Sequence, residues 1–148
     1  MIIKSLVQKL FLSMGLCLAM LFTSGVAKAQ NDAVSAAKNY LTGRKILLSW
    51  RQGGAIYGTY YFVWIDHCNS IYGLVGNSER HTIMDNTERK SWREAGYWDV
   101  VQYQSQIAIR YRSTTGRESA IPVAFTNDGR IIARNGGTIT LQGHANCR

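Results

Sequence analysis

The chain has 148 residues, of which 46% are hydrophobic and 18% are charged, and its 17 Lys and Arg residues outnumber its 9 Asp and Glu residues. This length excludes an assembly of several large domains and allows one domain with a modest hydrophobic core. The net charge of +8 favours contact with anionic surfaces such as phospholipid headgroups, lipopolysaccharide or nucleic acid, and it selects none of them.

Residues 1–29 have the pattern of a cleaved secretory signal peptide. Lys4 and Lys9 precede or flank an apolar stretch over 10–22, and Ala27 and Ala29 occupy the −3 and −1 positions of a signal peptidase site. We therefore expect a mature chain of residues 30–148 in the periplasm or outside the cell. Removal of three lysines with the signal peptide would leave 14 basic and 9 acidic residues, a net charge of +5.

Two other interpretations of this segment are weaker. An uncleaved membrane anchor requires roughly 20 apolar residues, and the polar or small residues at 23–25 interrupt the apolar run. A lipoprotein site at Cys17 requires a small residue before the cysteine, whereas Leu16 stands there. After cleavage we expect no transmembrane segment.

Cleavage also removes Cys17 and leaves Cys68 and Cys147. In an oxidising compartment an isolated pair of cysteines is expected to form a disulfide. The bridge would close a loop of about 80 residues, which the chain-entropy model equates with roughly 4 kcal/mol of stabilisation. We therefore predict a Cys68–Cys147 disulfide, with two free thiols as the alternative.

The mature chain begins with a helical pattern and then changes to strands. Residues 32–42 (DAVSAAKNYLT) cluster apolar side chains on one face, with Asp32 as the N-cap and Gly43 as the end. Alternating apolar residues over 46–50 predict a strand. The run 56–65 (IYGTYYFVWI) is rich in aromatic and β-branched residues on both faces, which predicts a central strand buried on both sides.

The segment 70–94 has the least regular pattern. Short strands are expected at 71–75 and 81–84. The stretch from Glu79 to Glu94 contains four acidic and four basic residues, which is typical of a solvated loop or an exposed edge. Loops of this kind often carry binding residues.

From Gly96 onward the pattern is that of an antiparallel meander, with strands and turns spaced roughly ten residues apart. Asp128 and Gly129 predict a tight hairpin turn. Pro122 predicts a strand position without a ladder hydrogen bond, as at an edge or a bulge. The side chains expected to face inward are Ile107, Ile109, Ile121, Val123, Phe125, Ile139 and Leu141.

Several short strands, one leading helix and no βαβ spacing predict a single all-β domain over 30–148. We expect a small antiparallel meander that closes into a barrel, because closure would bring Cys68, after the second strand, close to Cys147, after the last. A two-sheet β-sandwich is the alternative. Gly96-Tyr97-Trp98 resembles the Gly-x-Trp motif of lipocalin-like and avidin-like barrels, whose outline the domain shares, although their motif lies on the first strand. No binding residue is carried over from that resemblance.

The residues that could carry chemistry match no established motif. His67 and His144 flank the two cysteines and could join Asp66 at a metal, but a disulfide would remove the thiolate ligands, and we predict neither a metal nor a cofactor. No serine lies in a nucleophile elbow, no phosphate-binding glycine loop is present, and no carboxylate pair stands out as in a glycosidase. We therefore predict no catalytic residue.

Aromatic and arginine side chains are the remaining candidates for a binding site. Tyr60, Trp64 and Trp98 would offer rings to an apolar ligand or a sugar, or they would fill the interior of a small barrel. Arg110 and Arg112 share the outward face of one strand and would contact an anionic surface or a protein, or protect an edge from aggregation. The two arginines lack the neighbouring exposed aromatic residues that a binding surface for single-stranded nucleic acid would need.

These patterns favour a secreted or periplasmic binding module without enzymatic activity, which binds a small apolar molecule or a glycan at the barrel mouth. The first alternative is an inhibitor or immunity-type module that binds an envelope or extracellular protein through the 79–94 segment and the two arginines. The second is an enzyme of unrecognised type, which no motif supports.

Overall fold

The structure of the protein is a computed structural model that describes residues 28–54, 57–81 and 87–148. The chain divides into two units, Met1–Ala33 and Val34–Arg148. All eight strands belong to the second unit. Within the described part of the chain, no helix is both long enough and apolar enough to cross a membrane.

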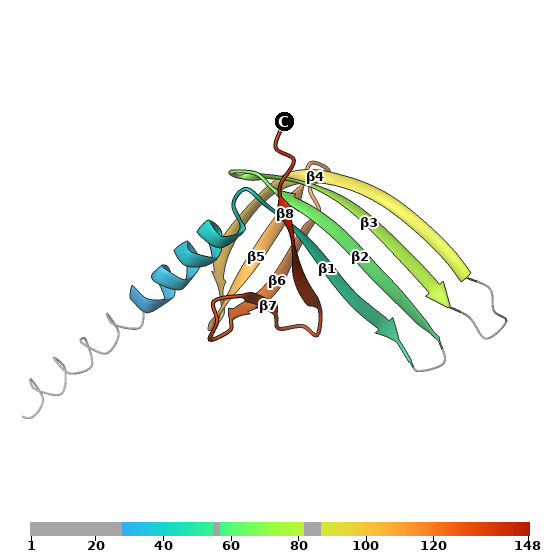
Figure 1. Cartoon of the computed structure of the whole chain (residues 1–148), viewed down its shortest axis with the longest axis horizontal. Helices are drawn as coiled ribbons and strands as arrows, with labels where there is room; N and C mark the ends of the chain where they lie inside the picture. Colours follow the sequence, from blue (N-terminus) through green and yellow to red (C-terminus); the bar gives the residue numbers. More distant parts are fainter. Residues whose placement is uncertain (1–27, 55–56, 82–86) are drawn as a thin grey trace, which may run out of the picture. The chain divides into compact units, whose positions relative to one another are not determined.

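The eight strands form one antiparallel sheet that curves into a nearly closed barrel, which confirms the predicted all-β barrel and excludes the two-sheet sandwich. Each of the first six strands pairs with the next in sequence, and the last strand, β8, returns to pair with the first. The strands are β1 (Arg44–Gly53), β2 (Gly58–His67), β3 (Ile71–His81), β4 (Thr87–Tyr103), β5 (Gln106–Ser113), β6 (Glu118–Phe125), β7 (Ile131–Ala133) and β8 (Thr138–His144) (Figure 1).

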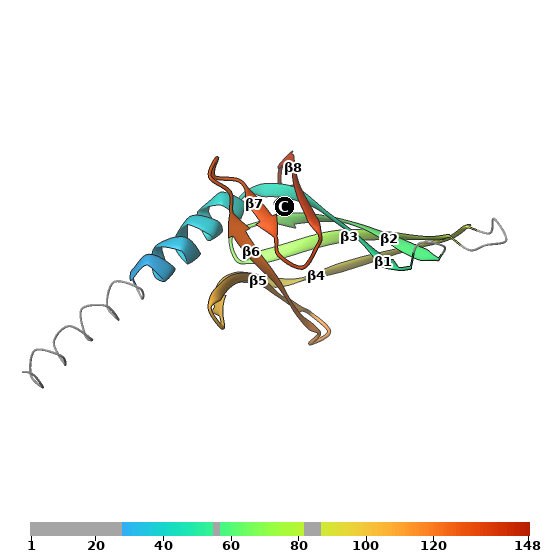
Figure 2. The same cartoon turned by 90° about the horizontal axis from the view of Figure 1, so that it is seen from below.

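The barrel has an open seam between its end strands, β7 and β8. β7 and β8 lie near each other but are not paired, so in the described sheet each of them has one edge without a strand partner (Figure 2). β7 has three residues and pairs only with Val123–Phe125, so the first half of β6 also lies at the open edge. Pro122 lies where the β6–β7 ladder stops, as its missing N–H requires.

Most of the predicted inward residues face the core. Ile109 and Val123 are buried, and Ile107, Ile121, Phe125 and Ile139 pack against the core while partly exposed. The pairs Ile107–Val123 and Ile109–Ile121 lie opposite each other on β5 and β6, which confirms the register. Leu141 is the exception: it pairs with the buried Ile46 but is 41% exposed, because β8 borders the seam.

β2 is a central strand, as predicted, but only one of its faces is buried. Val63 and Ile65 face the core, whereas Tyr60 is exposed on the other face and Phe62 and Trp64 are half-buried there. Phe62 and Trp64 stack on each other, with 6.4 Å between ring centroids. The prediction that both faces of this strand are buried was wrong. On the outer face, the aromatic rings pack against each other and are not covered by another layer of the described structure.

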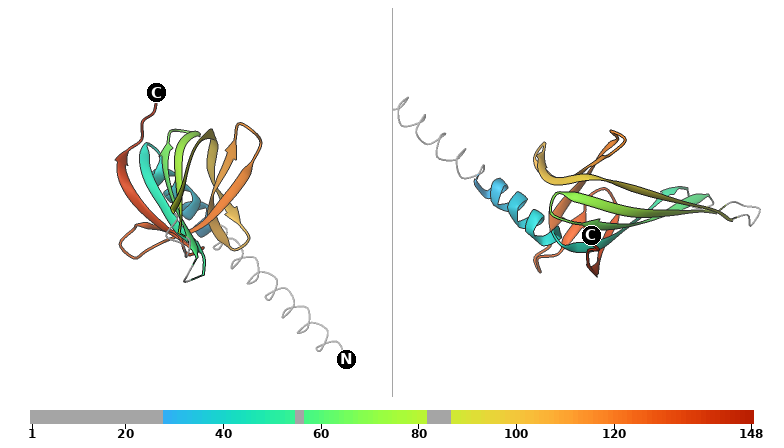
Figure 3. Two further views of the ribbon diagram at one scale, coloured as in Figure 1. Left: turned by 90° about the vertical axis from the view of Figure 1, so that its right-hand side faces the viewer. Right: turned by 90° about the horizontal axis from the view of Figure 1, so that it is seen from above.

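A solvated loop or an exposed edge was predicted for the charged segment from Glu79 to Glu94. As far as it is described, the segment is not a loop but forms strand. β3 and β4 pair along this segment and place Glu79 opposite Arg89 and Arg80 opposite Glu88. Opposite charges on paired positions favour the ladder. The ends of β1 to β4 therefore extend beyond β5–β8 (Figure 3). The predicted strand 81–84 lies mostly outside the described residues.

The helix covers 28–41 of the described chain and is longer at its start than predicted, so Asp32 lies inside it and is not an N-cap. Gly43 ends it with a φ of 75°, which glycine adopts without strain. The last turns of the helix join the barrel core through Ala37 and Leu41, which are both fully buried. Tyr40 packs edge-on against Phe125, with 6.3 Å between ring centroids.

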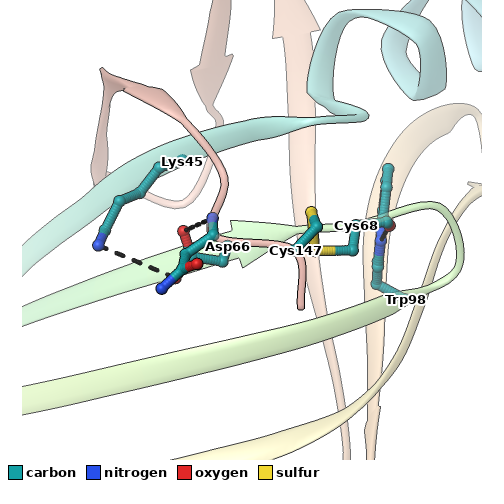
Figure 4. The surroundings of a disulfide bond; sticks show 6 residues. Lys45, Asp66, Cys68, Trp98 and Cys147 are labelled. Carbon is teal, nitrogen blue, oxygen red and sulfur yellow. Dashed lines mark hydrogen bonds and ion pairs between the residues drawn. A yellow bond between two sulfur atoms is a disulfide. The ribbon is translucent and has the colours of Figure 1, made fainter.

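The predicted Cys68–Cys147 disulfide is present and ties the chain end to the turn after β2 (Figure 4). Around it, the Trp98 indole donates to the Cys68 carbonyl at 2.6 Å, and the Asn146 amide donates to Asp66 at 3.0 Å. Lys45 pairs with the same Asp66 carboxylate at 3.8 Å. The disulfide thus lies in a network that holds β8 in place.

Candidate functional site

The inside of the barrel holds a cavity of about 480 Å³. This volume lies within the range of small-molecule sites, roughly 300–1,000 Å³. Its wall is largely apolar, with polar groups gathered on one side. The apolar and aromatic lining consists of Leu48, Trp50, Val63, Ile65, Leu74, Trp92, Tyr111 and Ile121.

Strand periodicity places these side chains inside the barrel. Leu48 on β1 pairs with Val63 on β2, so both side chains lie on the same face of the sheet. On β4, Trp92 lies opposite Gly76 of β3. A Cβ at position 76 would stand 2.1 Å from the Trp92 ring, so only glycine lets this indole lie across β3. The Gly76–Trp92 pair therefore shapes one wall of the cavity.

A buried aromatic cluster adjoins the cavity through Tyr111, which lines it. The His67 ring makes a 2.7 Å hydrogen bond to the Tyr111 hydroxyl through Nε2 and packs edge-on against Trp98 at 4.7 Å. Tyr72 packs edge-on against Tyr111 at 5.0 Å. Burial lowers the pKa of His67 to about 4, so the ring is neutral at pH 7. Burial also raises the pKa of Tyr111, and its hydroxyl remains protonated.

A chain of three polar side chains forms the charged side of the cavity. The Tyr72 hydroxyl donates to Glu94 Oε1 at 2.5 Å, and Arg117 Nη2 donates to Glu94 Oε2. Burial and the hydrogen bond to Glu94 raise the pKa of Tyr72. Glu94 and Arg117 both line the cavity. The carboxylate is thus held by a phenol at one oxygen and by a guanidinium at the other.

The backbone around Arg117 is held by a tight turn between β5 and β6. The Arg117 amide donates to the Ser113 hydroxyl at 2.9 Å, and the Ser113 amide donates to the Arg117 carbonyl at 2.8 Å. Gly116 takes a φ of 84° in this turn, which permits the reversal. The turn therefore places Arg117 at the mouth of the cavity with little freedom in its main chain.

Residues beside the seam form the rest of the cavity opening. Ser119 and Ala120 on the unpaired half of β6 lie on one side, and Asn135 and Gly137 from the segment between β7 and β8 also line the opening. Glu118 lines the cavity as well, but its carboxylate pairs with Arg112 at 2.5 Å. The opening is therefore bordered by the small residues Ser119, Ala120 and Gly137 together with polar side chains, Arg117 among them.

A second, more polar hollow of about 450 Å³ lies along the extended ends of β1 to β4. Its lining includes Arg80, Glu88 and Lys90. Trp50 lines the barrel cavity, Tyr61 lines this hollow, and the two rings stack with 4.8 Å between centroids. The stacked pair thus forms a wall that the two hollows share.

The structure does not bring the five predicted binding residues together. Tyr60 and Trp64 lie on the outer face of β2, where Arg51 stands over the Tyr60 ring at 5.4 Å. Trp98 is buried against His67. Arg110 and Arg112 are exposed on β5. None of the five is among the described residues that line the barrel cavity.

Sequence reasoning missed the residues that do line the polar side, above all Glu94 and Arg117. One signal was available: Trp92, Glu94, Gly96 and Trp98 occupy alternate positions, as residues on one face of a strand do. Extending that alternation back from Trp98 would have placed Glu94 inside the barrel. Arg117 lies in a turn, where no periodicity applies, so its side chain could not be assigned to a face.

The two candidate metal-binding histidines, His67 and His144, lie on the two strands that flank β1. Arg44 pairs with His67 of β2 on one side and with His144 of β8 on the other. His67 is buried and His144 is exposed. In the described part of the chain, no three His, Cys, Asp or Glu side chains gather as they would around a metal ion.

Comparisons of the chain with protein families, with curated proteins and with solved structures gave no match.

Proposed function

We propose that the protein is a binding module that holds a small, largely apolar molecule inside its barrel. The observation that carries this proposal is the cavity of about 480 Å³, which is lined by three aromatic rings and several aliphatic side chains. Small-molecule sites are typically concave and mostly apolar, with a few polar groups that orient the ligand. The cavity has this composition.

The surroundings of the cavity support binding rather than packing alone. Phe62 and Trp64 are on the outer face of β2, and Trp98, although buried in the core, packs against His67 and is not among the described residues that line the cavity. The seam beside β6 and the segment between β7 and β8 give a ligand a route to the interior. A wall that is already formed lowers the ordering cost of binding.

We place this activity in the periplasm or outside the cell. The disulfide between Cys68 and Cys147 is compatible with an oxidising compartment. The leader pattern of residues 1–29 supports export. Cleavage after Ala29 would leave all the described barrel contacts of the helix, including Ala37 and Leu41, in the mature protein.

The proposal is tested with N-phenyl-1-naphthylamine, a neutral apolar dye whose fluorescence rises in apolar surroundings. We expect the wild-type protein to bind one dye molecule. Ser119→Trp should reduce the affinity at least tenfold, because Ser119 is exposed at the mouth and a large ring there would occupy the entrance.

Ser91→Trp is the matched control, because Ser91 is exposed on the outer face of β4, opposite Asn77 of β3. It should bind the dye as the wild type does. Absence of saturable dye binding by the wild type, or equal loss in the two variants, would refute a ligand site in the barrel.

A further inference from the structure

We infer that the ligand of the barrel cavity is an amphipathic anion, with an apolar body and one carboxylate or similar acidic group that Arg117 binds. This inference rests on the proposed function and specifies the chemical class of its ligand. It follows from a difference between Glu94 and Arg117, which both line the cavity. Glu94 already has a hydrogen-bond partner at each carboxylate oxygen, whereas Arg117 is largely exposed and can bind the acidic group of a ligand.

Glu94 is the satisfied group. One of its carboxylate oxygens accepts the hydrogen bond from Tyr72, and the other accepts the hydrogen bond from Arg117. Its side chain is only 17% exposed. A cationic ligand would have to displace Arg117 from this carboxylate, and it would gain one ion pair only by breaking another.

Arg117 is the charged side chain that remains accessible to a ligand. Its side chain is 72% exposed, although its guanidinium is anchored on Glu94. A guanidinium has five N–H donors in a planar fork, and among the described residues Glu94 is the one acid that pairs with Arg117. The anchored fork is preorganised for a second carboxylate, to which it can donate two parallel hydrogen bonds.

The other acid at the mouth does not oppose this arrangement. Glu118 pairs with Arg112 at 2.5 Å, and the two residues lie opposite each other across β5 and β6. The Arg112 guanidinium therefore neutralises the Glu118 carboxylate on the strand face that carries Arg112. The rest of the cavity wall is largely apolar, with Leu74, Trp92 and Ile121 among its residues. A ligand with an acidic head at Arg117 would lay its apolar body against this wall.

The test uses three competitors that share a ten-carbon chain and differ only in the head group: decanoate, decanol and decylammonium. Each displaces N-phenyl-1-naphthylamine from the wild-type protein near pH 7. We expect decanoate to act at a concentration about tenfold lower than decanol, as one charge-assisted pair provides. Decylammonium should be the weakest of the three. Added salt should narrow the difference between decanoate and decanol.

Arg117→Gln should abolish the advantage of decanoate over decanol. Arg117→Lys, which keeps the charge without the planar fork, should retain part of it. Arg130→Gln is the matched control: the Arg130 side chain is 74% exposed and pairs with one acid, Asp128, in the turn after β6. It should behave as the wild type. Dye binding by each variant reports that its cavity is formed.

The outcomes separate this inference from the proposed function. If the wild type does not bind the dye, both are wrong. If the dye binds but decanoate is no better than decanol, or fails to displace the dye, the anionic ligand is wrong and the cavity site stands. The same conclusion follows if decylammonium is the strongest competitor, or if Arg130→Gln removes the decanoate advantage as fully as Arg117→Gln does.

Discussion

His67 is a titratable side chain that the fold keeps neutral. It is fully buried, and its ring contacts Trp98 and is hydrogen-bonded to Tyr111. Burial lowers its pKa to about 4, so the proton that the unfolded chain binds as the pH falls below 6.5 is excluded from the native state until the pH nears 4. The residue therefore couples the stability of the barrel to pH.

We expect the free energy of unfolding to fall as the pH falls from 6.5 to about 4. In this window the unfolded state binds more protons than the native state, so acid favours unfolding, by up to about 3 kcal/mol from this group. Denaturant unfolding at a series of pH values measures the slope.

His67→Gln should flatten the slope in this pH window, because glutamine does not titrate. His144→Gln should leave it unchanged, because His144 is exposed on β8. An identical slope in wild type and His67→Gln would show that the ring does not control acid stability.

At the scale of the elements, the packing of Trp92 of β4 over Gly76 of β3 gives the cavity one wall. The Trp92 ring occupies the space where a side chain of residue 76 would lie. This is a contact between two strands and depends on their register, which pairs Gly76 with Trp92. Alternation along β4 alone indicates the face of Trp92, but not the small residue opposite it.

Gly76→Ala should destabilise the protein by about 1–3 kcal/mol, the usual cost of overpacking, and should weaken dye binding because the indole must move. Urea unfolding and the dye titration measure the two effects. Gly73→Ala is the control on the same strand, because a Cβ there meets no atom within 4 Å. Equal stability of both variants would contradict the account of this wall.

For the barrel as a whole, the disulfide compensates for the weak side of the sheet. β8 pairs only with β1, because the seam lies on its other edge. Beyond β8, the chain end is held by the Ala145 amide, which donates to the Gly43 carbonyl at 2.9 Å, and by the Cys68–Cys147 bridge. The bridge closes a loop with a sequence separation of 79 residues.

The double variant Cys68→Ala/Cys147→Ala should lose about 4 kcal/mol of stability, because the cross-link no longer restricts the unfolded chain. Wild-type protein treated with a reductant should unfold at the same denaturant concentration as the variant. Thiol titration should detect no free cysteine in the mature wild type before reduction. A reduced protein as stable as the oxidised one would contradict the role given to the bridge.

Local sequence patterns determined much of the fold. The alternation over β5 and β6 predicted their inward residues, because a strand turns successive side chains to opposite faces. Gly43 marked the end of the helix, because its positive φ favours glycine. The cysteine pair followed from removal of the leader cysteine and from the expected compartment, and the structure confirms the bridge.

Only the tertiary structure decided where the cavity lies and what lines it. Tyr60 and Trp64 belong to a strand with apolar residues on both faces, so their pattern could not say which face the barrel would bury. Glu94 and Arg117 are 23 residues apart in sequence, and they meet because the turn after β5 lies beside the middle of β4, where the Thr114 amide donates to the Ala95 carbonyl at 3.0 Å. The seam, likewise, results from the shortness of β7. A cavity is space left between strands that are distant in sequence, and no local periodicity encodes it.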